Sequence, residues 1–411
     1  MTAIDRSQVQ DALGAADGLL RLAPAWVPRT FMHPGRRLRL HHDDLYALGA
    51  HRGGINERWF SSTTNADNGP GTPADEGLSY VHAEGGRRFL LKHAVDVAGD
   101  LLLGSAVMQR DGGWNVLCKF FDNMGPIPHH MHQTDAQAKL VGRKGKPEAY
   151  YFPPQYNQIE NNFPYTFMGL EPGTTKADVR RCLENWNKGD NGILDLSRAF
   201  KLQQGTGWQI DPGILHAPGS LVTYEPQVAS DVFAMFQSIV EGRAIDRSLL
   251  VKDVPPGKHH DLDFLVALLE WEANVDPEFA KHNRVFPVPA QPFAATEPRG
   301  FREQWVCYGT SWYSAKELTV LPKHTVTITD QAAYGIIVTQ GYGMFGPLRV
   351  STPAMIRFGD LTEDELFVSA DAAQQGDRIE NASASDPLVI LKHFGPGNPD
   401  AEPLRQSRTR S

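Results

Sequence analysis

The sequence predicts a mainly β protein whose antiparallel strands form sandwiches or barrels. The first observation is that 38 glycines and 29 prolines divide the chain into short apolar segments. The second is that these segments are rich in β-branched and aromatic residues and are bounded by turn residues, as short strands are. Many short strands joined by turns are typical of antiparallel sandwiches and barrels.

Strand-like segments occur in both halves of the chain. In the first half we predict strands at 87–97, 114–121, 136–142, 148–152, 165–170, 207–211, 220–226 and 232–240. In the second half we predict them at 304–322, 324–330, 334–346, 354–359, 365–370 and 387–395. A chain of 411 residues allows two or three domains, so the second half is expected to be a further small β-barrel.

Two segments break the strand pattern. In residues 174–204, apolar residues are spaced three and four apart over 179–186 and again over 193–200, which predicts helices. Residues 261–283 show the same helical spacing. The proline-rich segment 284–300 has no regular period and is predicted to be an extended linker.

Composition excludes several classes of protein. Lys and Arg total 40 against 48 Asp and Glu, and this net charge of −8 argues against a nucleic-acid-binding protein. No apolar run approaches the ~20 residues that span a bilayer, so no membrane partner is expected. The N-terminus lacks the pattern of a secretory signal, and the three cysteines are far apart. We expect a cytoplasmic protein.

Five residues form the candidate site. His130 and His132 are two apart on a predicted strand and therefore share a face, as do Lys146 and Glu148 on a later one. A Pro-Gly turn then places His216 at the start of a further strand. Three imidazoles and one carboxylate form an N3O set suited to Zn, Fe, Mn, Co or Ni. Surface or core histidines with ordinary hydrogen bonds are the competing interpretation.

The order of these motifs resembles the cupin superfamily, and more narrowly the type I mannose-6-phosphate isomerases. Lys-Pro-Glu at 146–148, with two ligands upstream and Pro-Gly-x-x-His at 212–216 downstream, carries the resemblance most specifically. The segments 52–59, 89–92 and 170–175 are also similar to family segments.

The resemblance implies a fold of two cupin (jelly-roll) β-barrels with a helical insert and a connecting helix. The N-terminal cupin domain would span 1–255 and carry the metal site and the insert at about 172–204. A helix and linker would follow at 256–300, and a metal-free C-terminal barrel at 301–398. Residues 399–411 would form a polar tail.

The resemblance also implies the chemistry. One divalent metal ion, expected to be zinc, would be held by His130, His132, Glu148 and His216, although the family has Gln where His130 stands. The reaction would be aldose–ketose isomerisation of a sugar or sugar phosphate through a cis-enediol. Lys146, on the same face as Glu148, would be the catalytic residue, because a lysine held beside a cation can exchange protons near neutral pH.

Two departures from the family pattern bear on the substrate. Met235 stands where the family has an arginine, and Arg243 or Arg247 is the candidate substrate-binding replacement. Asp135 follows the histidine motif where the family has a lysine that helps hold phosphate. Other candidate anion-binding residues are Ser61, Ser62, Thr63, Thr64, Arg87, Arg88, Lys139 and Arg143.

Three functions therefore remain open. The first is a metal-dependent sugar isomerase. The second is a cupin dioxygenase, in which non-haem iron uses a similar ligand set, and the third is a non-catalytic sugar-binding bicupin. The lysine favours the isomerase, because oxygen activation needs no such base. The missing arginine and lysine favour a binding role or a changed substrate.

Overall fold

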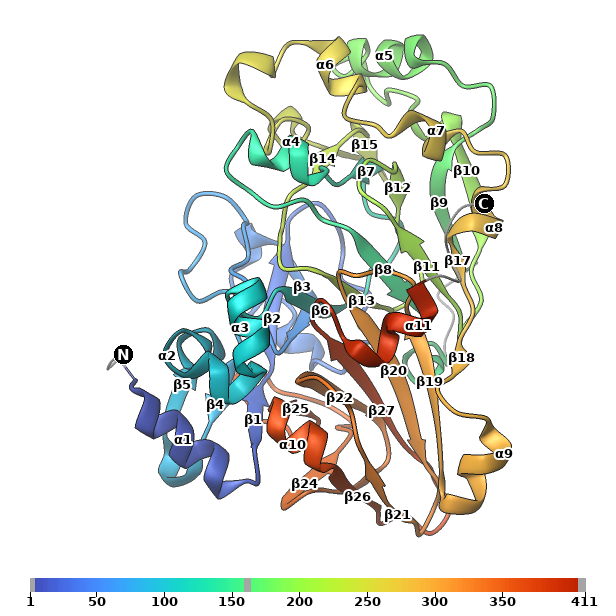
Figure 1. Cartoon of the computed structure of the whole chain (residues 1–411). Helices are drawn as coiled ribbons and strands as arrows, with labels where there is room; N and C mark the ends of the chain where they lie inside the picture. Colours follow the sequence, from blue (N-terminus) through green and yellow to red (C-terminus); the bar gives the residue numbers. More distant parts are fainter. Residues whose placement is uncertain (1–3, 159–163, 406–411) are drawn as a thin grey trace.

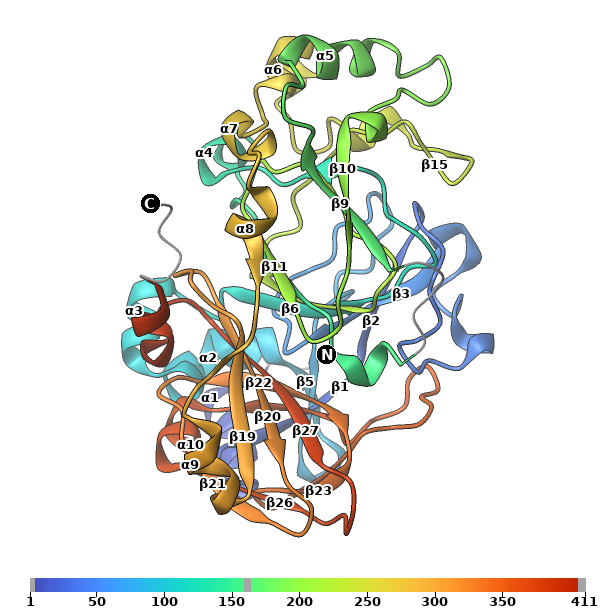
Figure 2. The same ribbon diagram turned by 90° about the vertical axis from the view of Figure 1, so that its right-hand side faces the viewer.

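Four antiparallel sheets are stacked along the long axis of the molecule (Figure 1). The computed structural model describes residues 4–158 and 164–405. Sheets of five and seven strands face each other in the upper half and are called here the first sandwich. Sheets of nine and four strands form the second sandwich in the lower half (Figure 2). The mainly β fold class is confirmed, and within the described residues the strand ladders are open sheets rather than closed rings.

The first sandwich holds the central part of the chain. Its seven-stranded sheet has the order β17 (Arg284–Val285), β11 (Gly207–Ile210), β8 (Glu148–Tyr151), β13 (Thr223–Val228), β6 (Val116–Phe121), β3 (Gly54–Phe60) and β2 (Ala25–Arg29). Its five-stranded sheet has the order β10 (Ser197–Lys201), β9 (Tyr165–Leu170), β12 (His216–Ala217), β7 (His130–Met131) and β14 (Ala234–Met235). A separate hairpin pairs β15 (Ile239–Val240) with β16 (Arg243–Ala244).

The second sandwich holds the C-terminal part of the chain together with three N-terminal strands. Its larger sheet has the order β18 (Val288–Pro289), β19 (Phe301–Cys307), β20 (Ser314–Val320), β27 (Leu388–Phe394), β22 (Tyr334–Gln340), β25 (Glu365–Val368), β1 (Leu19–Ala23), β4 (Tyr80–His82) and β5 (Arg88–Leu90). Its smaller sheet has the order β21 (Thr325–Ile328), β26 (Asp377–Asn381), β23 (Tyr342–Phe345) and β24 (Leu348–Ser351).

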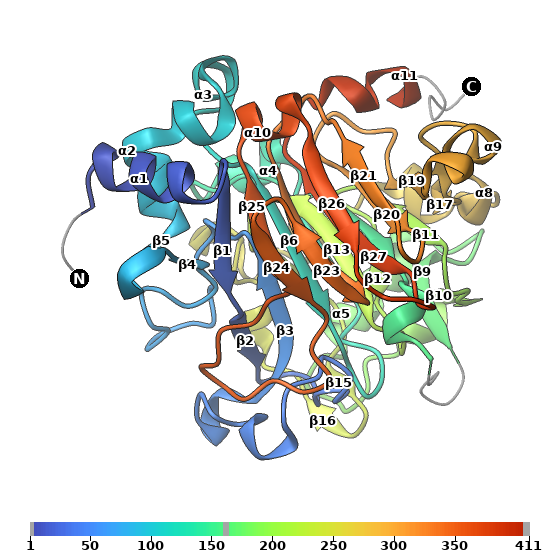
Figure 3. The same cartoon turned by 90° about the horizontal axis from the view of Figure 1, so that it is seen from below.

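Helices cover the outer faces and ends of the sheets. They are α1 (Arg6–Ala15), α2 (Leu91–Leu103), α3 (Ser105–Asp111), α4 (Asp135–Lys139), α5 (Lys176–Glu184), α6 (Leu262–Val266), α7 (Trp271–Asn274), α8 (Phe279–Asn283), α9 (Phe293–Thr296), α10 (Ala370–Gln375) and α11 (Glu402–Arg405). Single 3-10 turns include η5 (Leu194–Leu196) and η9 (Pro399–Ala401). Seen from below, α1, α2, α3 and α10 gather along one side of the sheets (Figure 3).

Among the described residues, five apolar clusters hold the layers together, and the three largest are described here. Between the sandwiches, Phe120 and Tyr224 from the seven-stranded sheet pack in one cluster with Ile337 and Leu391 from the nine-stranded sheet. Within the second sandwich, both sheets contribute aliphatic and aromatic residues to another cluster. Above the first sandwich, α5 and α6 pack on the outer face of the five-stranded sheet. Burial of these side chains is the main favourable contribution to folding.

Strand pairing crosses the expected domain boundary at residue 255. Strand β1 pairs with β25 on one side and with β4 on the other, so N-terminal residues extend the sheet of the second sandwich. The division at 255 stays a prediction, but the two parts of the chain share a sheet. The predicted linker 284–300 contains β17, β18 and α9, and the predicted tail begins with η9 and α11. Residues 406–411 of that tail lie outside the described residues.

Most predicted segments contain the expected element. Strands are confirmed within 114–121, 148–152, 165–170, 207–211, 220–226, 232–240, 304–322, 324–330, 334–346, 365–370 and 387–395. The helix predicted over 179–186 overlaps α5, and 261–283 forms the three short helices α6, α7 and α8. Segment 354–359 was predicted as a strand, but it contributes only an isolated bridge at Ile356.

Three segments adopt a different structure. Segment 87–97 is a strand only up to Leu90; α2 then begins, because its buried residues recur three and four apart. Segment 136–142 contains α4, whose start is fixed by a reciprocal capping box between Thr134 and Gln137. Segment 193–200 is η5 followed by β10, because pairing with β9 outweighs its helical spacing.

Candidate metal centre

Three histidines converge inside the first sandwich. His130 on β7 is directly paired with His216 on β12, and His132 follows immediately after β7. One ring nitrogen of each imidazole lies within 4.8 Å of a ring nitrogen of both others. All three side chains are buried. The shared face predicted for His130 and His132, and the strand start predicted for His216, are therefore observed.

Hydrogen bonds to the backbone orient each imidazole in the same way. The Nδ1 atom of His130 lies 2.8 Å from the carbonyl oxygen of Pro128, and that of His132 lies 2.7 Å from Val232 O. The Nδ1 atom of His216 lies 2.8 Å from Ile214 O. A carbonyl oxygen can only accept, so each Nδ1 must donate, and each neutral ring then presents an unprotonated Nε2.

Glu148 approaches the histidines from the opposite sheet. It is the first residue of β8, and its two carboxylate oxygens each lie 3.0 Å from an imidazole Nε2, one from His132 and one from His216. The hydroxyl of Tyr150, two residues along the strand, donates to the same carboxylate. Burial alone would raise the pKa of Glu148, but His132 and Lys146 hold the pKa well below its usual range.

The donor set fits a divalent metal ion. Burial lowers the pKa of His132 to about 4 and the pKa of His130 well below its usual value, so both imidazoles are neutral at pH 7, as metal ligation requires. Within the described residues, the buried Nε2 atom of His216 accepts no hydrogen bond, and it faces the Glu148 carboxylate at 3.0 Å. Such an unpaired buried acceptor is costly unless a cation satisfies it. Three nitrogens and one carboxylate match the preference of zinc and related ions.

Lys146 lies beside this cluster. Its Nζ atom is 3.0 Å from Glu148 Oε2 and 3.2 Å from His132 Nε2, and its side chain is buried. The expectation that Lys146 and Glu148 face the same way is therefore observed. The strand begins at Glu148 directly after Pro147, and it lies between β11 and β13 rather than at an edge of the sheet.

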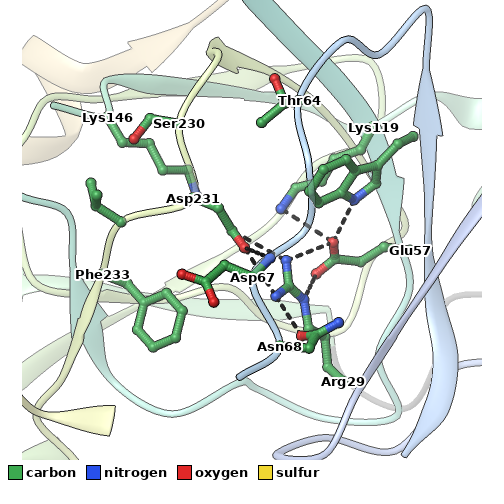
Figure 4. Close-up of polar contacts among 12 residues, drawn as sticks. Arg29, Glu57, Thr64, Asp67, Asn68, Lys119, Lys146, Ser230, Asp231 and Phe233 are labelled. Carbon is green, nitrogen blue, oxygen red and sulfur yellow. Dashed lines mark hydrogen bonds and ion pairs between the residues drawn. The ribbon is translucent and has the colours of Figure 1, made fainter. Parts of the chain in front are cut away.

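A chain of buried charges continues from Lys146 through the sandwich interior. Lys146 Nζ lies 3.6 Å from Glu225 Oε1, and Lys119 Nζ lies 3.3 Å from the same oxygen. Lys119 also lies 3.6 Å from Glu57, whose carboxylate binds the Arg29 guanidinium at 2.9 Å. Figure 4 shows the part of this chain from Lys119 through Glu57 to Arg29, with Asp231 on the other side of Arg29.

Sequence reasoning missed Lys119, Glu225 and Tyr150 as members of the site. A signal was present, because Lys119 and Glu225 each occur inside an otherwise apolar strand segment. Charged residues are seldom fully buried unless they are paired, so two such residues of opposite sign on predicted strands could have been matched. Their cross-strand pairing at β6 and β13 is direct. Tyr150 carried no comparable signal.

Other residues named from the sequence lie away from the cluster. Arg243 is on the hairpin strand β16 and pairs with Glu241, while Arg247 donates to the carbonyl oxygen of His259. No contact brings either arginine to the histidines among the described residues, so their assignment to substrate stays a prediction. Met235 is buried and pairs with His130 across β14 and β7.

A cavity of about 690 Å³ opens beside the cluster. Its lining includes Arg29, Asp67, Phe233 and Lys252 but, among the described residues, none of the four predicted ligands. It approaches the metal cluster through the segment 231–233: His132 bonds the carbonyl oxygen of Val232, and the side chain of the next residue lines the cavity. In Figure 4, the side chain of Lys146 points toward Asp231 at this boundary.

Two further observations complete the description of the site. His129, which was left out of the predicted ligand set, is buried, and neither of its ring nitrogens has a hydrogen-bond partner within the part of the chain that the structure describes. Burial lowers the pKa of His129 to about 3.

No helix formed by residues 4–158 or 164–405 combines the length and apolarity needed to cross a bilayer.

Comparison with known proteins identifies the fold. No protein-family model matches the sequence, and a search of curated proteins gives no match. Solved structures do match. The mannose 6-phosphate isomerase from Bacillus subtilis is 14% identical, with a TM-score of 0.58, over 92% of this chain and 99% of that one.

Two further structures agree. A mutant of the phosphomannose isomerase from Salmonella typhimurium is 12% identical with a TM-score of 0.59, over 92% of this chain and 100% of that one. A mannose 6-phosphate isomerase bound with zinc and yttrium is 13% identical with a TM-score of 0.58 and the same coverage. The chain therefore has the cupin-type fold of the mannose-phosphate isomerases.

Proposed function

We propose that the protein is a metal-dependent aldose–ketose isomerase that acts on a sugar. The observation that supports this most directly is that one ring nitrogen from each of three buried histidines lies within 4.8 Å of the others. The Glu148 carboxylate is 3.0 Å from two of these histidines and from Lys146. The metal assigned to His130, His132, Glu148 and His216 is one divalent ion. Zinc is our first choice, because a structural neighbour is a zinc-bound isomerase and the N3O set suits it.

The residues around the metal site can perform the proton transfers that isomerisation needs. A bound divalent ion supplies Lewis-acid polarisation of the sugar oxygens. We assign Lys146 Nζ to moving the proton between C2 and C1 of the sugar, because it is the basic side chain in contact with two ligands. Burial and the charge of Glu148 raise the pKa of Glu225 to about 8. The Glu225 carboxyl lies 3.6 Å from Lys146 Nζ, and we assign it as the group that exchanges a proton with the lysine.

The test is hydrogen exchange at the sugar carbon atoms. Zinc-loaded protein is incubated with free and phosphorylated hexoses and pentoses in D2O, and NMR follows deuterium at C1 and C2. We expect exchange with at least one sugar, and we expect Lys146→Met to slow it by about 10²- to 10⁴-fold, the usual contribution of a general acid–base, without loss of metal.

The matched control is Lys144→Met, which changes an exposed lysine two residues upstream whose partner is Asn115. It is expected to exchange at the wild-type rate. Full activity in Lys146→Met would remove this residue from the mechanism. Oxygen uptake by the iron-loaded protein without any deuterium exchange would instead identify a dioxygenase, and sugar binding without either reaction would identify a binding protein.

A further inference from the structure

The cavity beside the metal centre contains positive charges that are already neutralised. Lys252 is the clearest example, because its Nζ lies 3.2 Å from Asp67 Oδ2 and 3.4 Å from Asp253 Oδ2. The same ammonium donates to the backbone oxygen of Asp231 at 3.0 Å and lies 4.3 Å from the centre of the Phe233 ring. Its hydrogen-bonding capacity, three donors in all, is therefore met by the protein.

The Arg29 guanidinium is held from both sides. It binds Glu57 through two nitrogens at 2.9 and 3.2 Å, and it binds Asp231 through two nitrogens at 3.3 and 3.2 Å. Asn68 accepts a further hydrogen bond at 2.9 Å. Figure 4 shows the guanidinium enclosed by these three partners. A phosphate would have to displace a carboxylate to reach it.

The remaining cations of the lining are paired as well. Arg143 Nη2 lies 3.1 Å from Asp67 Oδ2, and Arg52 Nη2 lies 2.6 Å from Glu76 Oε2. Among the described lining residues, the four Arg and Lys side chains thus contact five carboxylates, those of Glu57, Asp67, Glu76, Asp231 and Asp253. With every carboxylate ionised, this set carries no excess positive charge.

A phosphate group and a neutral sugar make opposite demands on such a cavity. A phosphate dianion is bound by unpaired Arg or Lys groups, and a carboxylate at the same place repels it. Sugar hydroxyls both donate and accept hydrogen bonds, so the carboxyl groups of Asp67 and Asp253 and the amide of Asn68 are suitable partners. The Phe233 ring in the lining offers an apolar surface for the carbon face of a sugar.

We infer that the substrate is a neutral, unphosphorylated sugar held in this cavity. The inference rests on the proposed isomerase function for the chemical step, but the charge pairing that supports it is independent of the metal centre.

The first test compares matched sugars that differ only in the phosphate. For each pair, such as D-mannose and D-mannose 6-phosphate, kcat/KM for exchange in D2O is measured at pH 8, where free imidazoles are neutral. We expect the neutral sugar of the productive pair to be favoured by about tenfold or more, equivalent to ~1.4 kcal/mol. A phosphorylated sugar that reacts faster than its neutral counterpart would overturn the inference and leave the isomerase function intact.

The second test needs no turnover. Inorganic phosphate is titrated into the metal-loaded protein by calorimetry, and the same titration is made with Asp67→Asn, which removes the shared partner of Arg143 and Lys252. We expect no binding at millimolar phosphate in the wild type and at least about tenfold tighter binding in the variant, because Arg143 loses its carboxylate partner and Lys252 loses one of two.

The two tests separate the possible failures. Millimolar binding of phosphate to the wild-type cavity, abolished by Lys252→Met, would contradict the inference whatever the reaction. If no sugar of any pair exchanges deuterium, the proposed isomerase function fails. The phosphate titration then still decides whether the cavity accepts an anion.

Discussion

The interiors of the two sandwiches both contain buried ionisable groups, but these groups have different kinds of partner in the two interiors. In the first sandwich, the buried Nε2 atom of His216 accepts no hydrogen bond within the described residues, and it faces the Glu148 carboxylate at 3.0 Å. Lys146 and Tyr150 also contact this carboxylate. This interior therefore gathers imidazole nitrogens and a carboxylate in a set that suits a divalent ion.

The second sandwich balances its own charges. Lys316 lies 2.6 Å from Asp330 and 3.3 Å from Glu303, and Lys392 contacts the same two carboxylates, with its Asp330 contact at 2.6 Å. Two ammonium groups and two carboxylates close a ring with no formal charge left over. Similar sheet pairs can therefore hold either a cluster of histidines suited to a metal ion or a self-sufficient ion cluster, and the difference lies in the imidazoles.

Removing one ligand from the first interior should have the largest effect. In His132→Ala we expect bound metal to fall from about one ion per chain to below a tenth, and activity to fall by at least about 10³-fold, since the Lewis acid is lost. Elemental analysis after dialysis and the D2O assay measure both. The control is His393→Gln, which changes a buried histidine that hydrogen-bonds Tyr224 and lies outside the cluster. Equal metal loss in both variants would contradict the assignment.

Removing a cation from the second interior should change stability rather than metal content. Lys392 is fully buried, and removal of one partner from a buried ion pair costs about 3–5 kcal/mol. We therefore expect Lys392→Met to lower the free energy of unfolding by that amount, measured by urea denaturation, with metal still bound. Lys281→Met, at an exposed pair on α8, should cost no more than about 1 kcal/mol. If Lys392→Met unfolds at the same urea concentration as the wild type, the ion cluster does not stabilise the fold.

A substitution at the contact between the sandwiches should have the smallest effect. It should change how the free energy of unfolding depends on pH. Glu365 is buried beside Arg58, and burial raises the pKa of this carboxyl to about 7. The folded protein therefore keeps a proton there that the unfolded chain releases above about pH 4.5. The associated stability is fully present below pH 4.5 and is lost as the pH rises to about 7.

We accordingly expect Glu365→Gln to reduce the fall in unfolding free energy between pH 5 and pH 8 by about 1–3 kcal/mol. Denaturant titrations at several pH values measure the difference from the wild type. The exposed neighbour Glu363 pairs with Arg349 at the surface, and Glu363→Gln serves as the control with an unchanged pH profile. Identical slopes for Glu365→Gln and the wild type would show that this carboxyl does not titrate in that range.

Strand periodicity and a Pro-Gly turn are local properties, so the sequence predicted that His130 and His132 share a face and that His216 starts a strand. That these segments meet was implied only by the family resemblance. The sequence was not sufficient to predict how the interior charges pair. Glu57, Lys119 and Glu225 come from three different strands, and only the order of the strands in the sheet makes them neighbours. Tertiary pairing also explains why β1 joins the sheet of the second sandwich, since nothing in residues 19–23 specifies β25 as the partner.

One error in the predicted elements has a local cause and another has a tertiary cause. Segment 87–97 was assigned as a strand from its apolar content, although Leu91, Ala94 and Val95 already had the spacing of a helical face. In contrast, the helical spacing of 193–200 was real but was overridden by pairing with β9. Apolar composition alone therefore does not distinguish a helix from a strand. The spacing of apolar residues distinguishes them only where the segment cannot pair with the edge of a sheet.

Zinc K-edge X-ray absorption on stoichiometrically loaded protein tests the central claim most directly. We predict one ion per chain with three imidazole nitrogens and at least one carboxylate oxygen at about 2.0–2.2 Å. In His216→Ala, one of the three nitrogen ligands should be lost. The exposed group formed by His41, His42 and Asp43 is the competing site in the described chain. A spectrum unchanged in His216→Ala but altered in His42→Ala would contradict the account.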